Sequence, residues 1–267
     1  MVAAYRARAG AAYGGLCDDP WAAALAGPDG FEVAARFDKA FPYMDLWIAV
    51  RTAFIDRRLK AMVAAGFDQV VILGAGLDTR AARLASEGVR FFEVDQPASQ
   101  ALKRERLAAL EGYPEGAATF ASCDFEREDF LDRLSACGFE AGRPAFFIWE
   151  GVTPYLSEQA VRGTLERIAG GTAPASVVIF DIMRAKMAES EALAGQGRAT
   201  NETLGGLGEP LTWGINDPLP LLVEAGFRHT LTLPFDVLCC ALEGSYVRER
   251  EFRFQSIVQA SRATELT

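Results

Sequence analysis

The spacing of hydrophobic residues changes near residue 67. Upstream of that point, the segment FPYMDLWIAVRTAFIDRRLKAMVAAG has apolar residues at three- and four-residue steps, which is typical of a helix with one buried face. The residues that follow this period are Met44, Trp47, Ile48, Phe54, Ile55, Leu59 and Met62. Gly66 is suited to end the helix. We therefore expect residues 1–67 to form a mainly helical cap that belongs to the same domain as the rest of the chain.

Downstream, short apolar runs alternate with helical patterns. The predicted strands are QVVILG, VRFFEVD, ATFASCD, AFFIWEG and SVVIFDIM. The predicted helices are TRAARLASEG, PASQALKRERLAALEG, FEREDFLDRLSACG and SEQAVRGTLERIAGG. The first of these ends at Gly88, and Pro97 suits the first turn of the second. Continuous apolar strands are covered on both faces, so the alternation predicts an α/β fold with a doubly wound, mostly parallel, Rossmann-like sheet over residues 68–267.

The C-terminal part of the chain has a different pattern. A short helix, PLPLLVEAGF, ends at Gly226 and is followed by two strand-like runs, HTLTLPF and EFRFQSIVQAS. We expect these runs to form an antiparallel edge of the sheet. Residues 185–217 contain many glycines and little periodicity. Such an insertion in a compact domain is typical of a lid or binding loop, the alternative being a disordered surface loop.

Composition excludes several classes of partner. The chain has 267 residues, half of them hydrophobic, which is enough for the core of one α/β domain. Its 27 basic and 36 acidic residues give a formal net charge of −9, which disfavours nucleic acids and anionic membranes. The sequence contains neither an 18-residue apolar span nor the apolar core of a signal peptide, so we expect a cytoplasmic protein. Composition does not predict the oligomeric state.

Cysteines and histidine offer little catalytic chemistry. The five cysteines are Cys17, Cys123, Cys137, Cys239 and Cys240. Their number is odd and no C-x-x-C pair occurs, which favours reduced and mostly buried thiols. Cys239 and Cys240 lie in an apolar run, VLCCAL, and are expected to pack. A histidine-based metal site or a Ser-His-Asp triad would depend on the single histidine, His229, so no metal is expected.

Polar or glycine residues follow each of the first four strands. The first strand ends in Gly74-Ala75-Gly76, where glycines allow a ligand to approach the backbone closely. The second ends at Asp95, 19 residues after Gly76, which is the offset of an acid that accepts hydrogen bonds from ribose hydroxyls. Ligands of doubly wound sheets bind beyond these strand ends.

The third and fourth strands continue the series. Asp124 could accept from an adenine amine, with Phe125 offering an apolar face, and Glu150 could receive an ammonium group. Taken alone, each of the three acids (Asp95, Asp124 and Glu150) could equally be a helix cap or a solvated carboxylate. Four consecutive strand ends with glycine or acid nevertheless favour a nucleoside site.

The glycine turn favours a ligand without phosphate. A dinucleotide fingerprint would have a third glycine where this chain has Thr79, and Asp78 in the first helical turn would repel a pyrophosphate. S-adenosylmethionine carries ribose, adenine and a sulfonium cation but no phosphate. Its carboxylate needs a cation, for which Arg51 on the preceding helix is the candidate, although Arg51 could also be a surface arginine.

Several segments resemble one enzyme family. They are VVILGAGLDTRAARL, FFEVDQP, CDF and FIWEGVTPYLSEQAV, together with RTAFIDRRL, LTWGINDPLPLLVEAGF and CDDPWAAALAG. They resemble the leucine carboxyl methyltransferase family, and more closely its bacterial branch, the polyketide O-methyltransferases of the tetracenomycin type. The resemblance covers most of the chain and is weakest in residues 1–45 and 185–217.

The resemblance implies an S-adenosylmethionine site whose product is S-adenosylhomocysteine. It implies that Arg51 holds the methionine carboxylate, Gly74 and Gly76 line the methionine and ribose, Asp95 binds the ribose, Asp124 and Phe125 contact adenine, and Glu150 faces the methionine end. Some members also use a basic residue near the N-terminus, for which Arg6 and Arg8 are the candidates.

The implied reaction is an in-line displacement by an acceptor oxygen. A carboxylate is ionised at pH 7 and needs no general base, whereas a phenol does. With His229 expected to be structural, the scarcity of bases favours a carboxylate as the acceptor. The resemblance implies that this carboxylate belongs to a small molecule such as a polyketide. Tyr155, in the VTPYL turn, could position the substrate or simply pack. Alternatives are a protein C-terminal carboxyl methyltransferase, a nicotinamide-dependent oxidoreductase and a non-catalytic relative.

Overall fold

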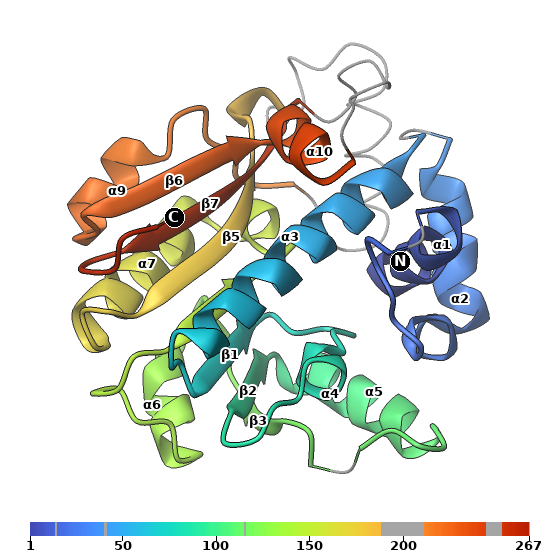
Figure 1. Ribbon diagram of the computed structural model, residues 1–267, viewed down its shortest axis with the longest axis horizontal. Helices are drawn as coiled ribbons and strands as arrows, with labels where there is room; N and C mark the ends of the chain where they lie inside the picture. Colours follow the sequence, from blue (N-terminus) through green and yellow to red (C-terminus); the bar gives the residue numbers. More distant parts are fainter. Residues whose placement is uncertain (14, 40–41, 115, 188–210, 244–252, 267) are drawn as a thin grey trace.

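A seven-stranded sheet forms the centre of the fold (Figure 1). The computed structural model describes residues 1–267 apart from 14, 40–41, 115, 188–210, 244–252 and 267. The strands are β1 (Gln69–Leu73), β2 (Arg90–Asp95), β3 (Thr119–Ser122), β4 (Phe146–Trp149), β5 (Val177–Met183), β6 (His229–Pro234) and β7 (Gln255–Ser261). Their order is β3-β2-β1-β4-β5-β7-β6. The first five strands are parallel, and β7 runs antiparallel between β5 and β6.

Helices cover both faces of this sheet. They are α1 (Val2–Ala12), α2 (Ala22–Phe37), α3 (Met44–Ala64), α4 (Arg80–Arg83), α5 (Pro97–Ala108), α6 (Phe130–Ala136), α7 (Glu158–Gly171), α9 (Leu219–Ala225) and α10 (Phe235–Glu243), with short 3₁₀ turns η1 (Thr153–Tyr155) and η2 (Ala185–Met187). In Figure 1, α3 runs across the sheet between the α1–α2 pair and α10. No helix in the described part of the chain is long and apolar enough to cross a membrane.

The alternation of side chains along β1 divides the core into two layers. Val70 and Ile72 point to one face and belong to the cluster formed with α3 and α10. Val71 and Leu73 point to the opposite face and pack with residues of α6 and α7. Because successive residues of a strand point to opposite faces, an entirely apolar strand requires helices on both sides. The doubly wound α/β class and the antiparallel C-terminal edge predicted from the sequence are confirmed.

Two local predictions differ from the structure. The segment TRAARLASEG forms only the four-residue helix α4, and a turn at Ser86–Val89 then leads into β2. The chain must reverse there within a few residues to begin the next parallel strand. The cysteines of the run VLCCAL were both expected to pack; the run forms α10, which buries Cys239 in the layer shared with α3 but leaves Cys240 exposed.

The cysteines follow the expectation of free thiols. All five lie in described residues and form no disulfide. Cys17, Cys123 and Cys239 are buried, and Cys137 is half-buried. Cys240 is exposed, because α10 turns only one face towards the core.

The predicted insertion at residues 185–217 lies largely outside the described residues, which resume at 211. Its end packs back onto the turn after β4: the Thr212 N–H donates to the Pro154 carbonyl at 2.8 Å, and the Thr212 hydroxyl donates to the Leu156 carbonyl at 2.8 Å. Trp213 is buried beside this contact. The end of the insertion is therefore fixed next to η1. The prediction that the insertion acts as a lid stays a prediction.

The end of β1 lies so close to the turn after β4 that only glycine fits. Gly74 has a φ of +65°, and a Cβ there would lie 2.3 Å from Cγ2 of Val152. We expect Gly74→Ala to lower the free energy of unfolding in urea by about 3 kcal/mol, from combined backbone strain and overpacking. Gly88→Ala is the control, since Gly88 has a φ of +77° and, within the described part of the chain, its Cβ position has no neighbouring atom within 4 Å. It should cost only about 1 kcal/mol. Equal losses would contradict the close-contact explanation.

Candidate active site

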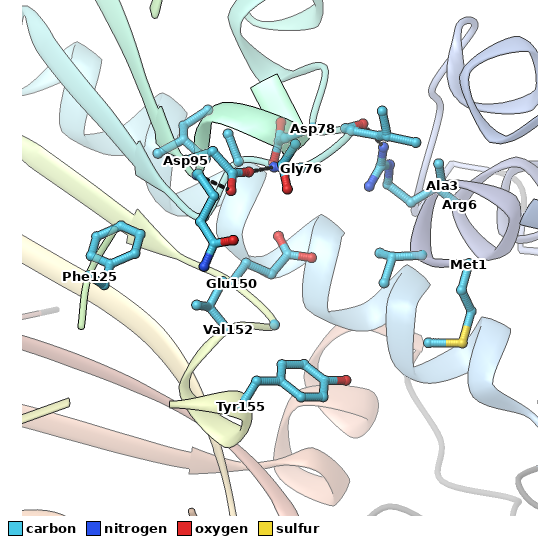
Figure 2. A pocket seen from close by; sticks show the side chains of 18 of the residues that line it. Met1, Ala3, Arg6, Gly76, Asp78, Asp95, Phe125, Glu150, Val152 and Tyr155 are labelled. Atoms are coloured by element: carbon cyan, nitrogen blue, oxygen red, sulfur yellow. Dashed lines mark hydrogen bonds between the residues drawn. The ribbon is translucent and has the colours of Figure 1, made fainter. Parts of the chain in front are cut away.

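A cavity of about 670 Å³ opens at the carboxyl ends of β1, β2 and β4 (Figure 2). Parallel strands deliver their C-terminal residues to one edge of the sheet, so residues far apart in sequence meet there. The sequence-predicted residues that line the cavity are Arg51, Gly74, Ala75, Gly76, Asp95, Phe125, Glu150 and Tyr155. Strand ends, the turn at η1 and helix α3 therefore contribute to one site.

Asp124 is the predicted site residue that does not line the cavity. Its Oδ1 accepts a hydrogen bond from the Glu126 N–H at 3.0 Å, and its Oδ2 lies 3.7 Å from the Arg127 Nε. The carboxylate therefore caps the turn that follows β3. Phe125, the next residue, points into the cavity instead (Figure 2).

Asp95 and the glycine turn are joined directly. The Gly76 N–H donates to Asp95 Oδ2 at 2.5 Å, and the Gln96 N–H donates to Oδ1 at 2.7 Å. Burial raises the pKa of the Asp95 carboxyl, while these two donors oppose that shift. Gly76 has a φ of +47°, and no atom of the described residues lies within 4 Å of its Cβ position, in keeping with its place in the cavity lining.

A buried lysine, Lys103, stabilises the backbone of the glycine turn that follows β1. Lys103 on α5 donates to the Asp78 carbonyl at 2.6 Å and pairs with Glu93 of β2 at 2.5 Å. Burial raises the pKa of Glu93 to about 7, against the lowering effect of Lys103. The sequence analysis missed this pair because charged residues in an amphipathic helix are usually assigned to its solvated face.

Asp78 faces the cavity with its charge compensated. Its side chain pairs with Arg80, whose backbone N–H also donates to Asp78 Oδ1 at 2.6 Å. Burial alone would raise the pKa of Asp78, but Arg80, Arg6 and Lys103 hold it well below its usual value. The expectation that a bare Asp78 charge repels phosphate therefore overlooked the adjacent guanidinium.

Arg51 and Glu150 are in direct contact at the cavity wall. Arg51 Nε donates to Glu150 Oε1 at 2.9 Å, and its Nη1 donates to Asp181 Oδ2 at 2.7 Å. Arg80 approaches the other oxygen of Glu150 at 2.5 Å. Burial alone would raise the pKa of Glu150, but the two guanidinium groups hold it below its ordinary value.

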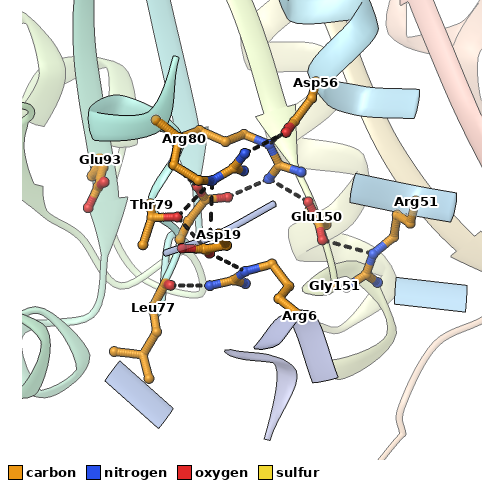
Figure 3. A network of polar contacts seen from close by, with 12 residues as sticks. Arg6, Asp19, Arg51, Asp56, Leu77, Thr79, Arg80, Glu93, Glu150 and Gly151 are labelled. Atoms are coloured by element: carbon orange, nitrogen blue, oxygen red, sulfur yellow. Dashed lines mark hydrogen bonds and ion pairs between the residues drawn. The ribbon is translucent and has the colours of Figure 1, made fainter. Parts of the chain in front are cut away.

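These contacts belong to a continuous ion network (Figure 3). Among the residues that the structure describes, the network joins Arg6, Arg51, Arg80 and Arg83 to Asp19, Asp56, Asp78, Glu150 and Asp181. Four arginines face five carboxylates, a formal excess of one negative charge. Buried charges persist only when they are paired in this way, so the network fixes the strand ends relative to α1 and α3.

The structure distinguishes the two N-terminal arginines. Arg6 is buried, lines the cavity, pairs with Asp19 at 2.9 Å and donates to the Leu77 carbonyl. Arg8 pairs with Asp38 at the partly exposed side of α1 and does not line the cavity. The two residues are two positions apart on a helix and therefore point in different directions.

One end of the cavity is apolar. Met1, together with Val2 and Ala3 at the start of α1, lines this end along with Tyr155 and Leu156, and Figure 2 shows Tyr155 and Met1 at the end away from Asp95. His229 begins β6 and does not line the cavity, as expected for a structural histidine. The cavity thus combines a polar end that contains carboxylates with an apolar end.

Known proteins resemble this chain in sequence. A model of the leucine carboxyl methyltransferase family matches residues 1–169. A Mycobacterium avium protein is 33% identical over 253 residues, which cover 87% of this chain and 82% of the relative. A Streptomyces coelicolor protein is 40% identical over 171 residues, 64% of this chain and 57% of the relative. Both are named as S-adenosyl-L-methionine-dependent methyltransferases.

Two solved structures share the fold. A protein from Thermobifida fusca, titled as a methyltransferase, has a TM-score of 0.64 at 16% identity and covers 90% of this chain and 92% of its own. A DUF574 family protein from Streptomyces avermitilis has a TM-score of 0.64 at 15% identity, covering 89% and 94%. These likenesses concern the fold alone. With the sequence match over more than half of its length, the chain belongs to the leucine carboxyl methyltransferase family of S-adenosyl-L-methionine-dependent methyltransferases.

Proposed function

We propose that the cavity binds S-adenosylmethionine and that the enzyme transfers its methyl group to a carboxylate oxygen of a small molecule. The observation that carries this proposal is the pairing of a nucleoside-type end, formed by the glycine turn and Asp95, with a charged end formed by Arg51 and Glu150. The cavity volume of about 670 Å³ lies in the usual range of small-ligand sites.

The nucleoside end suits adenosine. The Asp95 carboxylate accepts one backbone N–H at each oxygen and a side-chain hydrogen bond from Ser99, which leaves one lone pair for a ribose hydroxyl. Phe125 offers an apolar ring for the adenine. We leave Asp124 out of the proposed contacts, since its carboxylate is engaged in the turn after β3.

The charged end suits the amino-acid group of the cofactor. Arg51 and Arg6 would hold its carboxylate, and Glu150 would receive its ammonium. The network's excess of one negative charge complements a ligand whose sulfonium, ammonium and carboxylate sum to one positive charge. Arginine suits this role because its planar fork matches a carboxylate.

The residues around the methyl group supply little base chemistry. When bound, S-adenosylmethionine provides an electrophilic methyl carbon on a positively charged sulfur. In the part of the chain that the structure describes, no histidine or lysine lines the cavity. Glu150 has a lowered pKa and is held by two arginines, so it is a poor acceptor for a phenol proton of pKa near 10. The enzyme's contribution is then to exclude water and to hold an ionised acceptor, close to Tyr155, in line with the methyl group.

The acceptor is proposed to have an apolar body. Met1, Val2 and Leu156 at the apolar end of the cavity would contact apolar surface of the acceptor, while its reacting carboxylate would point towards the cofactor. A polyketide has this character, in keeping with the resemblance to the bacterial branch of the family. A peptide ending in leucine is the competing acceptor.

Binding of the cofactor depends on Asp95. We expect wild type to bind S-adenosylmethionine in calorimetry and Asp95→Asn to bind it at least about tenfold more weakly, because a charged hydrogen-bond acceptor is lost. Asp124→Asn is the matched control and should stay within about twofold, since that carboxylate faces the turn. Absence of binding by wild type would refute the cofactor site, and equal losses in both variants would refute the role of Asp95.

The two N-terminal arginines give a second matched pair. Arg6→Met should raise the KM for S-adenosylmethionine by about tenfold or more, because a cation at the cavity wall is removed. Arg8→Met lies on the same helix and should leave KM within about twofold. Thermal unfolding of each variant shows whether folding is intact. A larger KM effect from Arg8→Met would reverse the assignment.

The acceptor class is tested by pH dependence. With a panel of aryl and polyketide-derived carboxylic acids, methyl transfer should be nearly independent of pH between about 6 and 9, since a carboxylate is ionised throughout. A matched panel of phenols and a peptide ending in leucine serve as competitors. Faster transfer to phenols, with a rate that rises with pH, would contradict the carboxylate proposal. Preferred methylation of the peptide would contradict the small-molecule proposal.

A further inference from the structure

Asp181 is a buried carboxylate within an otherwise apolar strand. It lies on β5, in the segment VVIFDIM, and is 2% exposed. It does not line the cavity. Burying a carboxylate in a sheet is unfavourable unless each oxygen is paired, so its partners indicate what it contributes.

The two partners of the Asp181 carboxylate both belong to the wall of the cavity. Its Oδ2 accepts from Arg51 Nη1 at 2.7 Å, and its Oδ1 accepts from the Gly151 N–H at 2.6 Å. Its backbone carbonyl accepts from the Thr153 hydroxyl at 2.7 Å. A single residue of β5 thus holds a side chain of α3 and the turn that follows β4.

Arg51 is oriented from two sides. Asp181 holds Nη1 and Glu150 holds Nε, so the plane of the guanidinium is fixed. Gly151, with a φ of +70°, lies so close that a Cβ there would be 3.3 Å from Nη2. Cζ of the Arg51 guanidinium also lies 5.5 Å from the centroid of the Trp47 ring. These contacts leave N–H groups of Arg51 for a ligand while preventing the side chain from rotating.

We propose that Asp181 is a positioning residue that orients Arg51 for the carboxylate of the cofactor. The proposal rests on the proposed function, in which Arg51 holds that carboxylate. Asp181 acts through Arg51 and does not touch the cofactor. Its effect is therefore confined to ligands that carry the carboxylate, whereas a merely architectural residue would affect every ligand of the cavity.

The test compares two ligands that differ only in this group. Calorimetry measures binding of S-adenosylmethionine and of its decarboxylated analogue, which retains the sulfonium and the ammonium. Asp181→Asn keeps an oxygen for the Gly151 N–H but removes the charged partner of Arg51. We expect it to weaken S-adenosylmethionine by about tenfold or more. The decarboxylated analogue should change by less than about twofold.

Two further variants complete the design. Thr153→Val removes the hydroxyl that contacts the Asp181 carbonyl but leaves the carboxylate, and it should not change the ratio of the two affinities. Arg51→Met should lose the same selectivity as Asp181→Asn. The double variant should lose no more than Arg51→Met alone, because contacting residues that act together are non-additive. Thermal unfolding shows whether Asp181→Asn is folded. If it is not, Asp181→Glu replaces it; this variant keeps the charge but displaces Arg51, and we expect the same selective loss.

The possible results separate the inference from the function. Equal weakening of both ligands by Asp181→Asn, or no weakening of either, overturns the positioning role. An additive loss in the double variant also overturns it. Failure of wild type to bind either ligand, or full retention of S-adenosylmethionine affinity in Arg51→Met, overturns the proposed cofactor contacts themselves.

Discussion

The ion pairs of Arg51 with Glu150 and Asp181 are the contacts on which the rest of the site depends. They join α3, the end of β4 and the middle of β5, three elements distant in sequence. All three side chains are buried, so each charge needs its partner: removing one member of such a group costs about 3–5 kcal/mol. The apolar layers bring these elements together, and the ion pairs fix their relative position.

The two apolar layers and the polar cavity have different tasks. Val70 and Val71 pack into opposite apolar layers and stabilise the sheet without taking part in ligand binding. Specific chemistry begins where the strand ends: the Gly74 N–H still donates to the Val94 carbonyl of β2, whereas the Gly76 N–H donates to the Asp95 side chain. The buried Lys103 donates to the Asp78 carbonyl and so stabilises the backbone of the turn that follows β1.

The network also gives the cavity a defined electrostatic character. Asp78 and Glu150 have lowered pKa values because arginines surround them, so they stay ionised and are unsuited to accept protons from a weakly acidic substrate. These charges suit a cationic cofactor, and they are the basis of our proposal that the acceptor is already ionised.

The sequence by itself determined the parallel strands, the covering helices and the residues at the strand ends, because these follow from local periodicity and from where strands stop. It did not determine that β7 lies between β5 and β6, that Asp124 turns away from the cavity, or that Arg6 faces the cavity while Arg8 does not. Asp181 carried a signal, an acid in an apolar strand, but its partner was 130 residues away. Only tertiary structure decides such pairings, because they depend on which distant groups are buried together.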